Sequence, residues 1–379
     1  MNFFPFVWAE VDLLALKRNL KIIRSEISDR NTKILCVVKA NAYGHGMEEI
    51  AKALKKEGVD FFGVATIDEA LQLRRCCPKV NILVLGSFHK SQVPKYIESH
   101  IIPTISSLED LDHFEKALRN SSPRFPVHIK IDTGMGRLGV WHEEVEKFFK
   151  EAVRRKKIII GGIYTHFANA DHADKNRTDH QMVLFDAALQ KMKKLGINPR
   201  FIHAANSMGV VRFRYAHLNL VRPGIILYGM NPLINPLRNR RMLKKFTPIL
   251  SLKTRISFLK SVEPGRTISY GSTYKVSKKT ILATLPIGYS HGYRVGFSNK
   301  AFVIVKGKLC PVVGRVTMDQ TLVDVGRVPG VKRWDKVTLI GKDQNAEIQA
   351  SDLAALIGTV SYEISCALHS RIPRIYKGF

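Results

Sequence analysis

Residues that can act as bases, bind anions or form an imine come at the ends of several short apolar runs. The first is a lysine in the segment VVKANAYGHG, and later runs end near a second lysine, two arginines and two histidines. In chain order these residues are Lys39, Lys130, Asp132, Arg137, His166, His203, Asn206, Ser207, Arg222, Gly224 and Ile225. If the runs are parallel strands of one barrel, these residues converge on one mouth, where barrel enzymes place their chemistry.

The last two of these segments favour a phosphate site. Ser207 is well placed to cap a helix, and Gly224-Ile225 exposes backbone N–H groups after a proline. Helix N-termini and the last two loops of a barrel commonly bind phosphate. A phosphate cup together with Lys39 at the end of the first strand fits pyridoxal phosphate held as a Schiff base.

None of these residues is strong evidence by itself. A lone lysine at the end of a strand is usually a solvated charge, and a lone histidine such as His203 is usually structural. His166, His172 and His180 have no spacing typical of a helical or hairpin metal site, so we expect no metal. The prediction therefore depends on their joint placement.

The elements that position these residues alternate between helical and strand-like patterns. Apolar residues recur every three or four positions from Leu13 to Ile27 and from Met182 to Met192, which predicts helices. The apolar runs between helices are Ile34–Val38, Phe61–Ala65, Ile82–Leu85, Ile101–Ile105, Val127–Ile131, Ile158–Tyr164, Phe201–His203 and Leu218–Arg222. Eight such runs indicate an α/β fold of the (β/α)8 TIM-like barrel type. The alternative, a doubly wound sheet, lacks a GxGxxG segment after its first strand.

The pattern changes after about Phe246. Short alternating runs separated by glycine, proline and polar turns predict a mainly antiparallel β-domain. These runs cover residues 250–258, 281–285, 301–305, 309–313, 321–325 and 336–340, followed by a helix near Ser351–Ile357 and a strand at Ile372–Tyr376. We expect a cofactor-binding barrel over residues 8–245 and a β-domain over 246–379. An N-terminal strand within residues 1–11 is expected to join the β-domain.

The chain carries a formal net charge of +28, from 60 lysines and arginines against 32 aspartates and glutamates. The basic clusters at residues 154–157 and 238–245 could attract nucleic acid. They lack interleaved aromatic residues and any nucleic-acid motif, so a solvated basic surface is the preferred interpretation. We expect no nucleic-acid partner.

Other bulk features favour the cytoplasm. The five cysteines form no CxxC pair, which argues against a disulfide framework. No run approaches the roughly 18 apolar residues of a membrane helix. The apolar N-terminus lacks the basic leader and cleavage site of a secretion signal.

From about Trp8 to its C-terminus, the sequence resembles the bacterial alanine racemase family, which uses pyridoxal 5′-phosphate. The matching segments, in family order, are AEVDLLALKRNL (9–20), VVKANAYGHG (37–46), DTGMGRLG (132–139), THFANAD (165–171), HAANS (203–207), VRPGIILYG (221–229), ISYGSTY (268–274), IGYSHGY (287–293) and GRVTMDQ (314–320). The lysine segment is highly specific, and nine ordered matches make coincidence implausible. The resemblance also implies a barrel followed by a β-domain.

The resemblance implies that Lys39 binds the cofactor covalently and serves as one base. Tyr270 matches a second base, which the partner subunit contributes, so a homodimer with shared active sites is expected. Racemisation removes a proton from one face and returns it to the other, which explains two bases. The expected activity is interconversion of L- and D-alanine, which supplies D-alanine for peptidoglycan.

The other matched positions surround these two. The resemblance implies cofactor contacts for Tyr43, His166, Asn206, Ser207, Arg222, Gly224, Ile225 and Tyr362, substrate-carboxylate contacts for Arg137 and Met318, and entrance or supporting places for Lys130, His203, Tyr289 and Asp319. Lys130 matches a lysine that is carbamylated in some members. Arg222 matches the residue that faces the pyridine nitrogen, and arginine does not readily give up its proton. That nitrogen then stays unprotonated, which disfavours decarboxylation and transamination.

One position departs from the family pattern, and three alternative functions are left open. Thr317 stands where many relatives have cysteine, and we expect no loss of activity from it. The first rival is a related pyridoxal enzyme, either a serine or broad-specificity racemase or a decarboxylase. The second is a non-catalytic carrier of the cofactor, and the third is a basic binding protein on a decayed enzyme scaffold.

Overall fold

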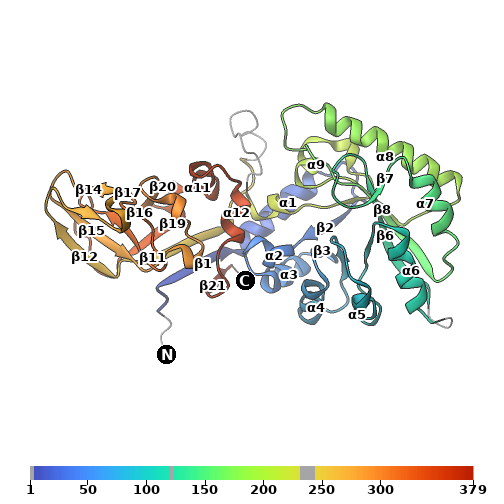
Figure 1. Cartoon of the computed structure of the whole chain (residues 1–379), viewed down its shortest axis with the longest axis horizontal. Coiled ribbons are helices and arrows are strands. Elements are labelled where there is room, and N and C mark those ends of the chain that lie inside the picture. The colour runs from blue at the N-terminus through green and yellow to red at the C-terminus, as the bar shows by residue number, and fades with distance from the viewer. Residues whose placement is uncertain (1–3, 120–122, 231–243, 379) are drawn as a thin grey trace.

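The computed structural model describes residues 4–119, 123–230 and 244–378 and arranges them in two regions (Figure 1). The first region is a barrel of parallel strands covered by helices, and the second is rich in antiparallel strands. The expected fold, a barrel followed by a β-domain, is confirmed.

Eight strands form the barrel, and each overlaps one of the predicted apolar runs. They are β2 (Lys33–Val37), β3 (Phe61–Val64), β4 (Asn81–Val84), β5 (Thr104–Ile105), β6 (Phe125–Asp132), β8 (Ile158–Tyr164), β9 (Phe201–His203) and β10 (Leu220–Val221). Paired neighbours are parallel, and a bridge from Leu83 to Ile102 links β4 to the segment before β5. Since β9 lies beside β10, and β10 pairs with β2, the ring closes. The short β7 (Val140–Trp141) pairs in parallel with the end of β6.

Helices cover the outside of the barrel strands. They are α1 (Leu13–Glu26), α3 (Met47–Lys56), α4 (Ile67–Cys76), α5 (Val93–Glu98), α6 (Leu108–Ala117), α7 (Val145–Ala152), α8 (Asn176–Lys194) and α9 (Ser207–Arg212), with the 3₁₀ turns η1 (Lys90–Gln92), η2 (Arg214–Ala216) and η3 (Ile225–Tyr228). The short α2 (Lys39–Tyr43) follows β2 and has left-handed backbone angles inside it. Strand residues alternate between the two sides, as the period of two requires. Leu35 and Val37 belong to a small interior cluster, whereas Cys36 belongs to the large core under the helices.

The buried side chain of Asn19 on α1 makes hydrogen bonds to two segments at the end of the barrel sequence. Its amide nitrogen donates to the carbonyl oxygens of Leu227 and Thr247, and its amide oxygen accepts from the N–H of Thr247. One side chain therefore ties α1 to η3 and to the segment that leads into the second domain.

The β-domain contains two sheets and a hairpin. Its elements are β1 (Val7–Asp12), β11 (Leu250–Arg255), β12 (Phe258–Val262), β13 (Thr267–Ile268), η4 (Tyr270–Ser272), β14 (Tyr274–Lys275), β15 (Thr280–Leu285), η5 (Tyr289–His291), η6 (Val295–Phe297), β16 (Phe302–Val305), β17 (Lys308–Pro311), β18 (Thr321–Asp324), β19 (Lys336–Asp343), β20 (Ala346–Ile348), α11 (Ala350–Leu356), α12 (Ser361–Cys366) and β21 (Arg374–Lys377). The larger sheet has the order β17-β16-β19-β11-β1-β21 with β20 on β19, and the smaller one has the order β12-β15-β18. The N-terminal strand β1 thus pairs antiparallel with β11 and parallel with β21.

Two features of this domain differ from the sequence pattern. The alternating run over residues 250–258 is two strands, because the chain leaves the larger sheet near Ile256 and joins the smaller one. Helix α12 was not predicted, since its six residues are too short for a helical period to show. It packs against α2 and so brings the C-terminal segment to the barrel mouth (Figure 1).

None of the helices within the described ranges is both long and apolar enough to cross a membrane.

Candidate active site

Lys39 begins a turn of unusual backbone conformation. The four residues from Ala40 to Tyr43 have φ angles of 51–53°, which is the left-handed region. This region costs an L-residue about 1–2 kcal/mol because Cβ approaches the next carbonyl oxygen. Four consecutive residues of this kind need support from the surrounding structure.

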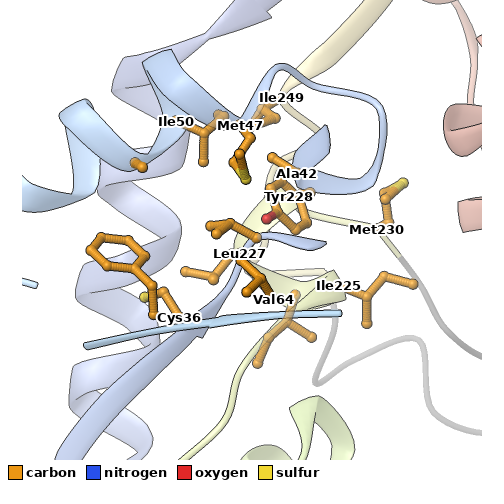
Figure 2. Packing of buried hydrophobic residues seen from close by; sticks show 14 of the residues in the cluster. Cys36, Ala42, Met47, Ile50, Val64, Ile225, Leu227, Tyr228, Met230 and Ile249 are labelled. Atoms are coloured by element: carbon orange, nitrogen blue, oxygen red, sulfur yellow. The ribbon is translucent and has the colours of Figure 1, made fainter. Parts of the chain in front are cut away.

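Part of that support comes from inside the barrel domain. The carboxylate of Glu69 accepts from the N–H of Ala40 at 2.6 Å and from the N–H of Ala65 at 2.7 Å. The side chain of Asn41 accepts from the N–H of Met47 at 2.8 Å. Figure 2 shows Ala42 and Met47 packed near Tyr228 and Leu227 in the buried cluster beneath the turn.

The C-terminal segment holds the other side of the turn. A Cβ on Gly44 would lie 2.0 Å from the carbonyl oxygen of Ser365 on α12. The guanidinium of Arg374 on β21 donates to the carbonyl oxygen of Gly44 at 3.2 Å from both Nε and Nη2. The position of Lys39 therefore depends on residues from both ends of the chain.

The surroundings of Lys39 lower its pKa. Burial is the largest cause and the charge of Arg137 adds to it, while Glu69 and Cys366 oppose them. A lysine with a lowered pKa offers more neutral amine at neutral pH than an exposed lysine does. Neutral amine is the form that attacks a carbonyl carbon.

Arg222 follows β10 and is 4% exposed. Its Nη1 donates to Nδ1 of His203 at 2.8 Å, and its Nη2 donates to the carbonyl oxygens of Thr165 and Ala204. Nη2 also lies 3.4 Å from Nδ1 of His166. None of these contacts uses the Nε–H, which leaves that donor for a ligand.

This network fixes several protonation states. Burial lowers the pKa of Arg222 to about 10, which still leaves the guanidinium charged at neutral pH. Burial and the nearby Arg222 charge hold the pKa values of His166 and His203 well below the usual value. Arginine has only donors, so each of these neutral histidines accepts at Nδ1 and carries its proton on Nε2.

The segments after β9 and β10 form a polar cup. Asn206 caps α9 by accepting from the N–H of Gly209, so the expectation that Ser207 is the cap was wrong by one residue. Ser207 instead accepts from the N–H of Gly224 through its buried Oγ at 2.9 Å. A Cβ on Gly224 would lie 2.9 Å from the hydroxyl of Tyr43.

Helix α12 contributes the remaining residue of this cup. Tyr362 is 37% exposed and lies close enough to Tyr43 for the two phenols to interact electrostatically. Burial is the main cause that raises the pKa of each, so both remain protonated donors at neutral pH.

The loop after β6 is organised around one carboxylate. Asp132 accepts from the backbone N–H groups of residues 134, 135 and 136 at Oδ1, and from that of Arg137 at Oδ2. Burial alone would raise the pKa of Asp132, but these four donors hold it below its usual value. Ionised Asp132 thus presents Arg137 at the barrel mouth.

Lys130, two residues earlier on β6, is 3% exposed. Burial, followed by the charges of Arg137 and Arg222, lowers its pKa to about 8. Its Nζ lies 5.8 Å from the centroid of the Tyr164 ring. The described part of the chain gives this buried ammonium no carboxylate partner.

Besides Tyr362, four of the expected site residues lie on the β-domain. Tyr270, Tyr289, Met318 and Asp319 are all exposed, Tyr270 by 71%. The N–H of Tyr289 donates to Thr317, and the next N–H donates to Met318, so these segments lie side by side. Figure 1 shows the hairpin that carries Tyr270 at the end of the β-domain remote from α2. One chain therefore keeps Tyr270 apart from Lys39.

The backbone beside Tyr270 is strained. Ser269 has φ 65° and ψ −175°, a combination that is nearly exclusive to glycine. Its hydroxyl donates to the carbonyl oxygen of Arg315 at 2.6 Å, which anchors the turn to the segment that leads to Met318. Such strain is commonly kept at functional positions.

Sequence reasoning missed Glu69, Arg374 and His128 as parts of this site. The segment from Thr66 to Glu69 is typical of a capping box, and nothing in it indicates that Glu69 reaches Ala40 instead. The contacts of Arg374 with Gly44 and of His128 with His203 each join residues more than 70 positions apart in sequence.

The basic cluster at residues 154–157 is partly neutralised. Arg154 pairs with Glu151, and Arg155 pairs with Asp112 and Glu151. Arg238, Arg240 and Arg241 of the second cluster lie outside the described residues. Within the described ranges, no three His, Cys, Asp or Glu side chains gather as metal ligands.

Comparison with known sequences matches nearly the whole chain. The family profile "Alanine racemase, N-terminal domain" matches residues 11–232, and "Alanine racemase, C-terminal domain" matches residues 249–376. Alanine racemase of Carboxydothermus hydrogenoformans is 40% identical over 370 residues, which cover 98% of this chain and 99% of the relative. Alanine racemase of Geobacter sulfurreducens is 40% identical over 372 residues, covering 97% and 96%.

Solved structures give the same result. Alanine racemase from Bacillus anthracis with bound L-Ala-P has a TM-score of 0.92 and 36% identity, covering all of this chain and 96% of that one. Alanine racemase from Bartonella henselae with covalently bound pyridoxal phosphate has a TM-score of 0.88 and 29% identity, covering 99% and 100%.

Proposed function

The chain belongs to the alanine racemase family, and we propose that it interconverts L- and D-alanine with two bases on opposite sides of the substrate. The observation that carries this proposal is the placement of Lys39, with its lowered pKa, beside the buried Arg222 network at one barrel mouth. The exposed Tyr270 on the other domain supplies the second base.

The barrel mouth fits pyridoxal 5′-phosphate. Gly224 keeps open a cradle that a Cβ would fill against the hydroxyl of Tyr43. The hydroxyls of Tyr43 and Ser207 lie at this cradle and can donate to a phosphate, while the N–H of Gly224 donates to Ser207. We propose that the phosphate is held by Tyr43, Ser207, Gly224, Ile225 and Tyr362. Asn206 supports them by capping α9.

Lys39 would hold the cofactor covalently in this proposal. The Nε–H of Arg222, which none of the contacts described above uses, would be available to the pyridine nitrogen. When bound, pyridoxal phosphate withdraws electrons from the substrate Cα and makes its proton removable. Because Arg222 keeps its own proton, it does not protonate that nitrogen. This choice of residue favours simple proton exchange over decarboxylation.

The two bases then move one proton each. The amine of Lys39 would take or give the Cα proton on one face. The partner subunit's Tyr270 does so on the other face. His166 accepts from Arg222 at Nδ1 and so directs its Nε2–H away from that guanidinium, which fits a link to the tyrosine.

The substrate carboxylate needs cationic contacts at the same mouth. We propose that Arg137, whose backbone Asp132 fixes, supplies one cationic contact to this carboxylate. The partner subunit's Met318 contacts the carboxylate from the opposite side in this proposal. Lys130 and His203 support this wall from inside the barrel. The partner subunit's Tyr289 and Asp319 line the entrance.

The separation of these residues in one chain supports a homodimer. Lys39 and Tyr270 lie on different domains, and the tyrosine is exposed rather than packed. A second copy that brings its β-domain to the barrel mouth would complete two equivalent sites. We further propose a cytoplasmic enzyme, without metal or nucleic acid, whose D-alanine serves peptidoglycan. All five cysteines are free.

The direct test is formation of D-alanine from L-alanine by the purified, cofactor-loaded protein, with L-serine in parallel. Conversion of alanine and slow conversion of serine are expected. Comparable rates on both would replace alanine racemase by a broad-specificity racemase. Release of carbon dioxide would indicate the decarboxylase, and bound cofactor without any turnover would indicate the carrier.

A further inference from the structure

His128 lies inside the barrel, one layer below the candidate active site. It is 1% exposed, and its ring packs against the rings of Phe61 and Phe201 with centroid distances of 6.0 Å to each. Those two rings also contact each other, at a centroid distance of 5.4 Å. On the adjacent strand, a Cβ at Gly162 would lie 2.5 Å from the His128 ring, so a glycine makes the room that this ring occupies. The barrel thus provides a dedicated place for an imidazole in an apolar layer.

The ring makes one hydrogen bond that reaches the site. Nδ1 of His128 lies 3.0 Å from Nε2 of His203, and Nδ1 of His203 lies 2.8 Å from Nη1 of Arg222. Three side chains from β6, β9 and the segment after β10 therefore form one buried line.

The donor and the acceptor of each of these hydrogen bonds follow from Arg222. Arg222 can only donate, so His203 accepts at Nδ1 and, as a neutral ring, has its proton on Nε2. That proton is donated to His128, which must then accept at Nδ1 and carry its own proton on Nε2. Burial lowers the pKa of His128 to about 3, so the ring is neutral at neutral pH. With its only proton on Nε2, it cannot donate from Nδ1 to His203.

We propose that His128 is a positioning residue that holds His203 in the tautomer able to accept from Arg222, and thereby fixes the guanidinium at the barrel mouth. Without an acceptor at His128, the Nε2–H of His203 would be buried and unpaired, which costs free energy. The other tautomer would relieve that cost, but it would point an N–H at the guanidinium. Arg222 would then have to move.

This inference rests on the proposed function, in which Arg222 contacts the cofactor. A small displacement of such a group is enough to reduce turnover substantially. His128 touches neither substrate nor cofactor in this proposal, so its effect should appear in kcat more than in KM.

The test compares His128→Phe, which keeps a flat ring without an acceptor, with His128→Asn, whose Oδ1 replaces Nδ1. We expect kcat to fall by about 10- to 100-fold in the phenylalanine variant and to recover largely in the asparagine variant. Phe61→Leu, which changes a ring in contact with His128, is the matched control for packing in this layer. Equal losses in the two His128 variants would overturn the proposal.

A second measurement does not depend on turnover. Nitrogen NMR of histidine-labelled holoenzyme reports which nitrogen of His203 is protonated. The wild type and His128→Asn should show the Nε2–H form, and His128→Phe should show the Nδ1–H form. A wild-type His203 that is charged or protonated on Nδ1 would overturn the proposal, even if no variant folds. Failure of the wild type to racemise alanine would instead contradict the proposed function.

Discussion

The hydroxyl of Tyr376 on β21 donates to the carbonyl oxygen of His45 at 3.2 Å, in the loop that carries Lys39. The donor lies three residues from the end of the chain, and the acceptor lies immediately after the left-handed turn. The last strand therefore holds the loop that carries Lys39 in its own chain. In the proposed dimer, the β-domain would support the active site of its own chain and offer Tyr270 to that of the partner.

The first prediction concerns Gly46, whose φ is 98° and whose Cβ would lie 1.7 Å from the Tyr376 hydroxyl. We expect Gly46→Ala to destabilise the protein by about 2–4 kcal/mol, because strain and overpacking add. It should also weaken cofactor retention. Thermal unfolding and absorbance of the bound cofactor measure the two effects. Gly196→Ala is the control, since Gly196 has φ 70° and nothing within 4 Å of its Cβ position. Equal losses in both variants would contradict the role of Tyr376.

The second prediction concerns the phosphate cradle. Gly224→Ala should push the Tyr43 hydroxyl away and weaken pyridoxal-phosphate binding by about 10-fold, roughly the loss of one hydrogen bond to a charged group. Equilibrium titration of the apoprotein with the cofactor measures this change. Gly161→Ala is the matched control, since its Cβ would meet neighbours at 3.5 Å or more. Unchanged affinity in Gly224→Ala would remove the cradle from the proposed site.

The third prediction concerns pH and Lys130. Its pKa is about 8 in the folded chain against 10.5 for the free side chain, so the buried charge destabilises the folded state below pH 8. The destabilisation is lost as the pH rises from 8 to 10.5, where only the unfolded chain still holds the proton. Lys130→Met should therefore be more stable than the wild type by about 1–3 kcal/mol near neutral pH, and this advantage should vanish toward pH 10.5.

Denaturant unfolding across this pH range provides the measurement. Lys147→Met, at an exposed position on α7, should show no such pH-dependent difference. An advantage of Lys130→Met that stays constant with pH would show that Lys130 is not a buried free ammonium.

The fourth prediction concerns the shared site. Lys39→Ala should lose the covalent link to the cofactor, whereas Tyr270→Phe should keep the cofactor and lose most racemisation. In an equal mixture of the two variants, each mixed dimer has one complete site, so activity should return to about a quarter of the wild-type value. Mixing after subunit exchange, with each pure variant as its own control, gives the measurement. A mixture as inactive as its components would place both bases in one chain.

Local pattern in the sequence was enough for the architecture. The apolar runs gave eight barrel strands within a few residues of their observed bounds, and the three-to-four spacing from Leu13 gave α1. These features follow from side-chain period, which is a property of neighbouring residues. Because barrel strands share one direction, the residues at their ends, including Lys39 and Arg222, could be assigned to one mouth from the sequence.

Only the tertiary structure decided which atoms meet there. The acceptor for Arg222 is His203, the partner of His203 is His128, and the support of Ala40 is Glu69. Each contact joins different strands, helices or loops, and no local period encodes it. The left-handed turn likewise exists because segments far along the chain stabilise a backbone that its own residues disfavour. The sequence determined the helices and strands and the chemistry that each of them can carry. Packing between distant segments decided the geometry of the site, because hydrogen bonds and steric fit depend on distances that only folding creates.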